Sequence, residues 1–421
     1  MSYNSATANP LSASWPLLLG MAVLMLGAGL QGTLIGLRAT LEGFAPLVIG
    51  VVMSCYYVGY VAGSFGVPPF VRRVGHIRVF AALTAIASVA ILLQGVFVTA
   101  SVWAMLRLVS GFCFAGIYIV AESWLNDRAT NESRGTVVAF YMFILYLGLG
   151  GGQFLLNVAD PSGPMLFVAT SVLISLAVVP MSLSAQRAPE FASARRIRLG
   201  DLYRVSPMGV VGVVISGMLT GALFSIGPVY AKLIGFNAPG ISTFMGVSIL
   251  AAVATQLPIG KLSDRMERRT VLTAVCGAAA LVAAVAATLD YTSRTILFIL
   301  AACHGGLVLT LYSLALSHIN DHLDPSQMVS ASASVILLNG LGSVAGPVLF
   351  SLLVGAFGPA AYFGTMAALT GALAGYAIWR KQRRAPVPRE AKVPFVGAQP
   401  EAGRQLVADA AKGRAPARQE H

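Results

Sequence analysis

The stretch Tyr118-Ile-Val-Ala-Glu-Ser-Trp-Leu-Asn-Asp127 recurs 194 positions later as Tyr312-Ser-Leu-Ala-Leu-Ser-His-Ile-Asn-Asp321. Both copies lie in strongly apolar surroundings and share Tyr, Ala, Ser, Asn and Asp at the same spacing. Glycines repeat at the same offset, namely Gly111 with Gly305, Gly148 with Gly342, and Gly152 with Gly346. A membrane chain made of two similar halves is the usual plan of a solute transporter, whose substrate binds between the halves.

The composition also points to a membrane protein. The chain is 57% hydrophobic and 10% charged, with a mean hydropathy of +0.77. Soluble domains carry about 25% charged residues, and a single core could not bury so much apolar surface. We expect an all-α membrane protein, because open strands would leave backbone groups unpaired in lipid. The 44 glycines suit a bundle of closely approaching helices.

Apolar segments divide the chain into two halves. We predict twelve membrane-spanning helices, each near the about 20 residues that cross hydrocarbon, at residues 16–37, 45–67, 79–99, 102–121, 137–157, 165–184, 208–231, 242–262, 271–289, 295–316, 332–355 and 360–379. They form two pseudo-symmetric six-helix halves, over 16–186 and 208–379. A short N-terminus (1–15) precedes them, and a basic linker (187–207) joins them. The tail (380–421) is basic, polar and predicted to be disordered.

Lysine and arginine are distributed unequally between the two sides of this bundle. The loops on the side of the termini, with the start of the tail, hold eighteen, whereas the opposite side holds only Arg38, Lys232 and Arg294. The positive-inside rule then places both termini in the cytoplasm of a multi-pass protein of the inner (plasma) membrane. The net charge of +12 reflects this topology and contact with anionic lipid rather than a nucleic-acid partner.

Other function classes lack their sequence signals. No P-loop, H-E-x-x-H or nucleophile-elbow motif occurs, so we expect no enzymatic activity and no cofactor. His318 and His322 lie beside Asp321 and Asp324, but loop capping explains them better than a metal site, and we predict no metal. The sequence contains neither a repeated pore segment nor a ring of charges, the features that would indicate a channel. A transporter-like sensor that moves nothing remains an alternative.

The loop Gly260-Lys-Leu-Ser-Asp-Arg-Met-Glu-Arg-Arg269 combines an acid with several arginines. Gly260 lets a helix end approach its neighbour closely, and Asp264 can cap a helix N-terminus. Arginines can reach carboxylates at neighbouring helix ends. We interpret the loop as a gate on the cytoplasmic side. Asp264 should approach the start of segment 5 near Gly135, and Arg265 should approach Asp321.

This loop resembles the G-x-L-[AS]-D-R-x-G-R-R signature of the major facilitator superfamily, with Glu267 in place of the second glycine. The first-half loop keeps Arg73 and Gly75 but has Arg72 where the signature has Asp. Arg73 should lie near Asp127, which repeats as Asp321, or near Glu122. The candidate gate residues are Arg73, Gly75, Asp127, Gly260, Asp264, Arg265, Arg268, Arg269 and Asp321.

Further motifs extend the resemblance over about residues 16–380. Arg107 and Gly111 match the R-x-x-x-G pattern of segment 4, and Gly342-x-x-x-Gly346-Pro347 resembles a glycine–proline motif of antiporters. The resemblance implies the fold of that superfamily and alternating access. It also implies a cavity lined by segments 1, 4, 7 and 10. The cavity candidates are Gln31, Arg107, Tyr118, Ser216, Thr220 and His304.

Ionisable residues inside the membrane limit the class of solute that the protein is expected to move. A charge at the bilayer centre costs at least about 2.5–3.5 kcal/mol and usually faces a wet cavity, although Arg107 could instead snorkel to the interface. Arg38 and Arg107 would make the cavity positive, which favours a neutral or anionic solute. Glu122 and His304 are the candidates for proton coupling, although Glu122 could be a gate residue and His304 a core histidine. The predicted core contains no cluster of oxygen ligands that could bind sodium as a coupling ion.

The sequence therefore predicts a secondary active transporter. We expect a monomer that moves a small neutral or anionic organic solute by alternating access, coupled to protons or as a uniporter. Proton-exchanging efflux of amphipathic compounds is the main alternative, because of the partial glycine–proline motif in segment 11.

Overall fold

The computed structural model describes residues 14–130, 133–183, 197–289, 293–383, 388 and 392–399. The first half contains α2 (Trp15–Leu41), α3 (Pro46–Val74), α4 (His76–Val96), α5 (Ala100–Arg128), α6 (Arg134–Gln153), η1 (Phe154–Asn157), α7 (Met165–Leu176) and α8 (Val178–Ser182). The second half follows the short α9 (Leu199–Val205) and contains α10 (Pro207–Leu233), α11 (Ala238–Arg265), α12 (Arg268–Thr288), α13 (Arg294–Asn320), α14 (Pro325–Phe357) and α15 (Ala360–Lys381).

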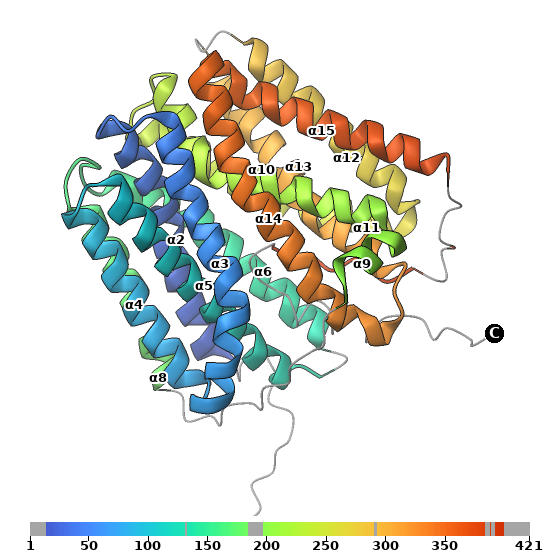
Figure 1. Cartoon of the computed structure of the whole chain (residues 1–421), viewed down its shortest axis with the longest axis horizontal. Coiled ribbons are helices and arrows are strands. Elements are labelled where there is room, and N and C mark those ends of the chain that lie inside the picture. The colour runs from blue at the N-terminus through green and yellow to red at the C-terminus, as the bar shows by residue number, and fades with distance from the viewer. Residues whose placement is uncertain are drawn as a thin grey trace, which may run out of the picture.

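These helices confirm the predicted all-α fold. Within the described residues, twelve helical spans are long and apolar enough to cross a membrane. Figure 1 shows the helices of the first half grouped on one side of the molecule and those of the second half on the other. The predicted N-terminus lies largely outside the described residues, as does most of the tail. The predicted linker is described from residue 197 and contains the helix α9.

Several helices extend beyond the predicted apolar segments. α5 runs to Arg128 rather than to about residue 121, and α13 runs to Asn320 rather than to about residue 316. An apolar window detects only the part of a helix that crosses hydrocarbon, whereas backbone hydrogen bonding continues into the polar final turns. The repeated acids therefore stand at helix ends, with Asp127 inside the last turn of α5 and Asp321 directly after α13.

The start and end of the helices follow local sequence. α2, α3, α10, α11 and α14 each have proline in their first turn, where the missing N–H is not needed. Gly43 and Gly235 take positive φ angles of 75° and 87° just after α2 and α10, a conformation that glycine adopts without steric cost. Asn237 caps α11 by accepting a hydrogen bond from the Gly240 N–H at 3.1 Å.

The repeated glycines mark close helix crossings that occur once in each half. A methyl group added at Gly111 would lie 1.8 Å from the Tyr56 carbonyl oxygen, where α5 crosses α3. A methyl group added at Gly305 would lie 2.3 Å from the Ser248 carbonyl oxygen, where α13 crosses α11. Only glycine fits such contacts, so the repeat in sequence encodes a repeated helix pair.

A second crossing repeats in the same way. A methyl group at Gly152 of α6 would lie 2.2 Å from the Leu26 carbonyl oxygen of α2, and one at Gly346 of α14 would lie 2.2 Å from the Met218 carbonyl oxygen of α10. The residue after each glycine differs. Gln153 follows in α6, and its amide donates hydrogen bonds to backbone carbonyls of α2 and α6 at 2.9 and 3.1 Å. Proline follows in α14.

We name the two ends of the bundle by charge. The basic end holds Arg72, Arg73, Arg134, Arg265, Arg268, Arg269, Arg380 and Lys381 among its described residues. The opposite end holds Arg38, Lys232 and Arg294.

Contacts between the halves gather toward the opposite end. At the opposite end of the bundle, where α3 begins and α14 ends, a methyl group added at Gly50 would lie 2.0 Å from Ser351 Oγ. Asn157 of η1 donates a hydrogen bond to Ser242 Oγ of α11 at 3.0 Å. At the basic end, α6 and α11 instead line a cavity. The structure is therefore closed at the opposite end.

The glycine crossings lead to a stability prediction. Gly111→Ala and Gly305→Ala should each lower the thermal unfolding midpoint of the purified protein, because overpacking a tight contact costs about 1–3 kcal/mol. Gly277→Ala is the matched control, since nothing lies within 4 Å of a methyl group added there. If the first two variants unfold at the same temperature as the control, the crossings do not need glycine.

Candidate functional site

A central cavity lies between the two halves. It is lined by residues of α2, α3, α5 and α6 from the first half, and of α10 and α13 from the second. Four of the predicted cavity residues lie in its wall, namely Gln31, Arg107, Tyr118 and Thr220. Residues that the sequence did not single out for the cavity are Ala28, Gly32, Tyr56, Tyr57, Phe114, Tyr146, Leu149, Phe224, Ser225, Leu309 and Gln399.

Arg107 is held inside this cavity by aromatic rings. Its guanidinium carbon lies 4.4 Å from the centre of the Tyr56 ring, a cation–π contact, and the residue is only 4% exposed. Phe114 and Tyr57 pack against Tyr56, with ring centres 6.1 and 5.3 Å apart. Arg107 therefore points inward rather than toward the membrane interface. Tyr56 and Tyr57 form a wall of the cavity.

Two amide side chains supply further polar groups to the cavity. Gln31 and Gln399 are 2% and 5% exposed, and the Nε2 atom of each is buried without a hydrogen-bond partner among the described residues. A buried donor without a partner is costly, so both amides are suited to an acceptor oxygen brought by a ligand. Tyr118 contributes mainly its ring, because its hydroxyl donates to Met25 Sδ at 3.3 Å.

Two predicted cavity residues lie elsewhere. Ser216 is fully buried at the α10–α14 crossing, where its hydroxyl donates to the Val213 carbonyl oxygen and accepts from the Asn339 amide. His304 lies on the side of α13 that faces α15, with its ring 5.7 Å from the Phe363 ring centre. Membership of a cavity-lining helix does not determine which face of the helix meets the cavity, and this is why the two residues differ from expectation.

Arg38 does not add charge to the cavity. Its guanidinium forms an ion pair with Glu42 at 2.6 Å and donates to backbone carbonyls of residues 161–163 at the opposite end. The positive charge of the cavity wall therefore comes from Arg107 rather than from both arginines.

Glu122 is buried toward the basic end of α5, at 2% exposure. Tyr141 of α6 and Tyr312 of α13 lie within electrostatic reach of its carboxylate. Because α13 belongs to the second half, this carboxylate faces the interface between the halves.

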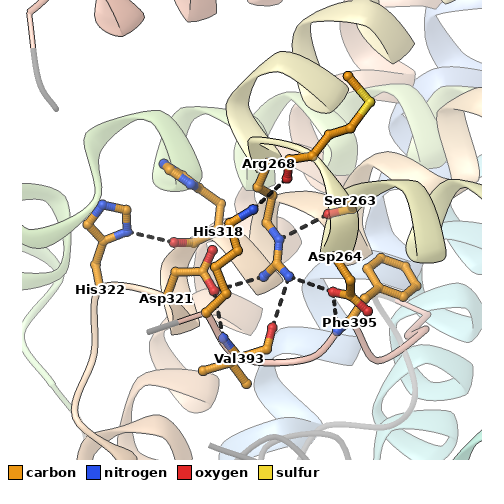
Figure 2. A network of polar contacts seen from close by, with 10 residues as sticks. Ser263, Asp264, Arg268, His318, Asp321, His322, Val393 and Phe395 are labelled. Atoms are coloured by element: carbon orange, nitrogen blue, oxygen red, sulfur yellow. Dashed lines mark hydrogen bonds and ion pairs between the residues drawn. The ribbon is translucent and has the colours of Figure 1, made fainter. Parts of the chain in front are cut away.

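A cluster at the basic end is centred on Arg268 (Figure 2), which is 2% exposed. The guanidinium donates to Ser263 Oγ and to one carboxylate oxygen each of Asp264 and Asp321, all at 3.0 Å. It also donates to the Val393 carbonyl oxygen at 2.9 Å. The cluster thereby ties α11, α12 and the end of α13 together.

The pairing in this cluster differs from expectation. Asp321 bonds to Arg268 rather than to Arg265, because Arg268 at the start of α12 faces inward whereas Arg265 is exposed. Asp264 pairs with Arg268 and accepts a hydrogen bond from the Phe395 N–H at 2.8 Å. Burial raises the pKa of Asp321 to about 6, although Arg268 acts in the other direction.

Glu267, which replaces the glycine of the signature, has its own partners. Its carboxylate accepts from Arg269 at 2.7 Å and from Lys381 at the end of α15 at 3.3 Å. Partial burial raises the pKa of Glu267, but the Thr270 hydrogen bond and the two positive charges outweigh burial and hold the pKa below its usual range. The departure from the signature thus links α12 to α15.

The loop of the first half that corresponds to the Arg268 loop has fewer polar contacts among the described residues. Gly75, with φ of 95°, separates α3 from α4, and His76 Nε2 lies 3.0 Å from Ser123 Oγ. Arg73 is exposed, and no ion pair joins it to Asp127 or Glu122 in the described part of the chain. Arg72 stands where the signature has an acid, and within the described residues no arginine of this half is bound to two acids as Arg268 is.

The tail contributes residues that the sequence did not predict. Residues 392–399 lie outside the helices, and Val393, Val396, Ala398 and Gln399 are buried. A short apolar run, Val393-Pro-Phe-Val-Gly-Ala398, within an otherwise polar tail is the signal that distinguishes this segment. The prediction of a disordered tail does not describe these residues.

Comparison with known proteins agrees with this architecture. The model of the Major Facilitator Superfamily matches residues 17–332 and, separately, residues 210–412. The chain is 27% identical over 345 residues to an uncharacterized MFS-type transporter, Ent638_1421, of Enterobacter sp. (strain 638), covering 80% of this chain and 88% of the relative. It is 28% identical over 342 residues, with the same coverages, to the uncharacterized MFS-type transporter YcaD of Salmonella arizonae.

Solved structures show the same fold. The crystal structure of the nucleoside transporter NupG superposes with a TM-score of 0.73 at 14% identity, covering 87% of this chain and 98% of that one. A crystal structure of a bacterial homolog of the human lysosomal transporter Spinster superposes with a TM-score of 0.68 at 13% identity, covering 97% and 99%.

The Arg268 cluster leads to a second prediction. Arg268→Ala should lower the thermal unfolding midpoint strongly, because removing one partner of a buried ion pair costs about 3–5 kcal/mol. Arg265→Ala, at an exposed position in the same loop, is the control and should have a small effect. Adding Asp321→Asn to Arg268→Ala should recover part of the loss, since it removes the stranded charge. Equal midpoints for the two single variants would show that the cluster is not structural.

Proposed function

This chain belongs to the Major Facilitator Superfamily, and from that premise we propose that it moves a small neutral or anionic organic solute through the central cavity by alternating access. The observation that carries the proposal is the cavity itself, whose wall combines residues of both halves with one arginine and several aromatic rings. A site shared by two halves changes its exposure when the halves rock against each other.

The chemistry of the wall favours an organic acid or a carbonyl compound with an apolar body. Arg107 and the Gln31 amide offer hydrogen-bond donors to oxygen acceptors. Tyr56, Tyr57 and Phe224 offer apolar faces. A cationic solute would meet Arg107, and the described residues of the cavity wall include no carboxylate that could offset its charge.

The orientation follows from charge. The basic end is proposed to face the cytoplasm, so a structure closed at the opposite end corresponds to an inward-facing state of an inner-membrane protein. The contacts of Gly50 and Asn157 with the second half support this assignment.

Proton coupling is proposed to run through Glu122. This residue is buried, and Tyr312 of the other half lies within electrostatic reach of it, so its environment changes when the halves move. His304 is less well placed, because it lies outside the cavity wall, against Phe363.

A second candidate is efflux of amphipathic compounds in exchange for protons. The aromatic lining of the cavity and the Gly346-Pro347 step of α14 favour it. Direction of proton-driven flux in proteoliposomes separates the two functions, because uptake moves solute with the proton and efflux moves it against the proton.

A ligand screen tests the cavity. We expect carboxylates with an aromatic or branched body to raise the thermal midpoint of the purified protein more than amines of the same shape. A ligand at 100 times its Kd stabilises by about 2.7 kcal/mol. Arg107→Ala should abolish the shift, and Arg107→Lys should not restore it if two hydrogen bonds are needed. A preference for amines, or a normal shift in Arg107→Ala, would contradict the proposed site.

Flux measurements test the coupling. With a ligand from the screen, a pH gradient imposed on proteoliposomes should accelerate transport, and Glu122→Gln should remove the acceleration while exchange without a gradient persists. His304→Gln is the matched control and should retain proton-driven flux. Acceleration by sodium alone, at constant pH and potential, would contradict proton coupling.

A further inference from the structure

The tail segment 392–399 binds the second half through its backbone. The Val393 N–H donates to Asp321 at 3.0 Å, and the Val393 carbonyl oxygen accepts from Arg268 at 2.9 Å. Two residues later, the Phe395 N–H donates to Asp264 at 2.8 Å. Figure 2 shows these contacts converging on one cluster. A run of backbone bonds to charged side chains, of which Arg268 and Asp321 are buried, is a specific binding mode for a chain segment.

The segment continues along α11 and α13 toward the centre of the molecule. The Ala398 N–H donates to Ser313 Oγ at 2.9 Å, and the Ala398 carbonyl oxygen accepts from Ser313 Oγ at 2.9 Å and from the Gln256 amide at 3.4 Å. Phe395 lies over Gly260, where an added methyl group would be 2.3 Å from the ring. The next residue, Gln399, reaches the wall of the central cavity.

The segment also separates the two halves at the basic end. Phe395, Val396 and Gly397 line a cavity whose other walls are α6 of the first half and α11 of the second. The space left in the central cavity, where Gln399 lies, is only about 70 Å³. The segment therefore occupies the route by which a solute would pass between the cavity and the basic end.

We propose that residues 392–399 are a tethered plug that binds a site made by α11, α12 and α13 and closes the route between the cavity and the basic end. The consequence for transport depends on the proposed function, whereas the binding of the plug does not.

The plug and the gate compete for the same groups. Asp264 binds the Phe395 N–H through Oδ1, and the same carboxylate is expected to cap the start of α6 near Gly135 when the basic end closes. Gly135 and Phe395 line the same cavity, so the segment occupies part of the space between α6 and α11 at the basic end. The plug must leave before the basic ends of α6 and α11 can meet. A tether of about ten residues after Lys381 gives an effective concentration in the millimolar range, so modest affinity keeps the plug bound.

Accessibility of the cavity tests the plug without a transported ligand. In a background with the four native cysteines replaced, Thr220→Cys would be labelled with a membrane-impermeant maleimide in inside-out vesicles. Deletion of 392–421 should accelerate labelling about tenfold, as when a route open in one molecule in ten becomes open in all. Deletion of 401–421 is the matched control, because it keeps the segment, and should label as slowly as the full chain.

A full-length variant guards against misfolding of the truncated protein. Ala398→Trp should accelerate labelling in the same way. Ala398 is 1% exposed, and both its N–H and its carbonyl oxygen are hydrogen-bonded to Ser313, so a large side chain there should displace the segment. Equal labelling rates for the full chain, the 392–421 deletion and Ala398→Trp would overturn the plug.

Cross-linking tests the contact directly. A methyl group at Gly397 would lie 3.0 Å from Gln256 Cδ, so Gln256→Cys with Gly397→Cys should form a disulfide under mild oxidant, detected as a linked peptide by mass spectrometry. Absence of this disulfide would overturn the binding of the segment. If the disulfide forms and labelling of Thr220→Cys slows, but proteoliposome flux of a screened ligand is unchanged, the plug binds and the proposed transport route is the part that fails.

Discussion

The close crossing of α5 over α3 positions the candidate site. At Gly111 the two backbones approach so closely that a side chain would overlap the Tyr56 carbonyl. Tyr56 is thereby fixed with its ring against Arg107, one helical turn before Gly111. In a bilayer, helices gain little from apolar burial against each other, so close packing through small residues carries much of the association. The repeat of the crossing at Gly305 gives the second half the same frame.

The two halves share this frame but differ in the polar groups at the basic end. The second half has a buried arginine bound to two acids, whereas the first half has exposed Arg72 and Arg73. The described backbone hydrogen bonds of residues 392–399 are made with the half that has the cluster. The asymmetry between two otherwise similar halves thus explains why the tail segment lies against α11–α13 and lines the gap facing α6.

The sequence predicted the features that depend on composition and repetition. Helix number, pairing of halves and the inward direction of Arg107 follow from apolar length, from the 194-residue offset and from the cost of a charge in lipid. Features that depend on helix rotation were not predictable. His304 and Ser216 lie on the predicted helices, but on faces that do not meet the cavity. Arg265 is the last residue of α11 and Arg268 the first of α12, so the two side chains point in different directions, and Arg268 is the one that reaches Asp321. The position of residues 392–399 depends on tertiary contacts that a polar tail does not reveal.

Rocking of the halves about a shared cavity is the central claim, and distances between spin labels measure it most directly. One pair, at Leu47 and Phe357, would report on the opposite end, and a second pair, at Val74 and Leu262, on the basic end; all four side chains are exposed. Double electron–electron resonance should resolve a short and a long distance for each pair. Deletion of 392–421 should increase the population of the short distance at the basic end and decrease the population of the short distance at the opposite end. A single unchanged distance at both ends, with and without the deletion, would contradict the account.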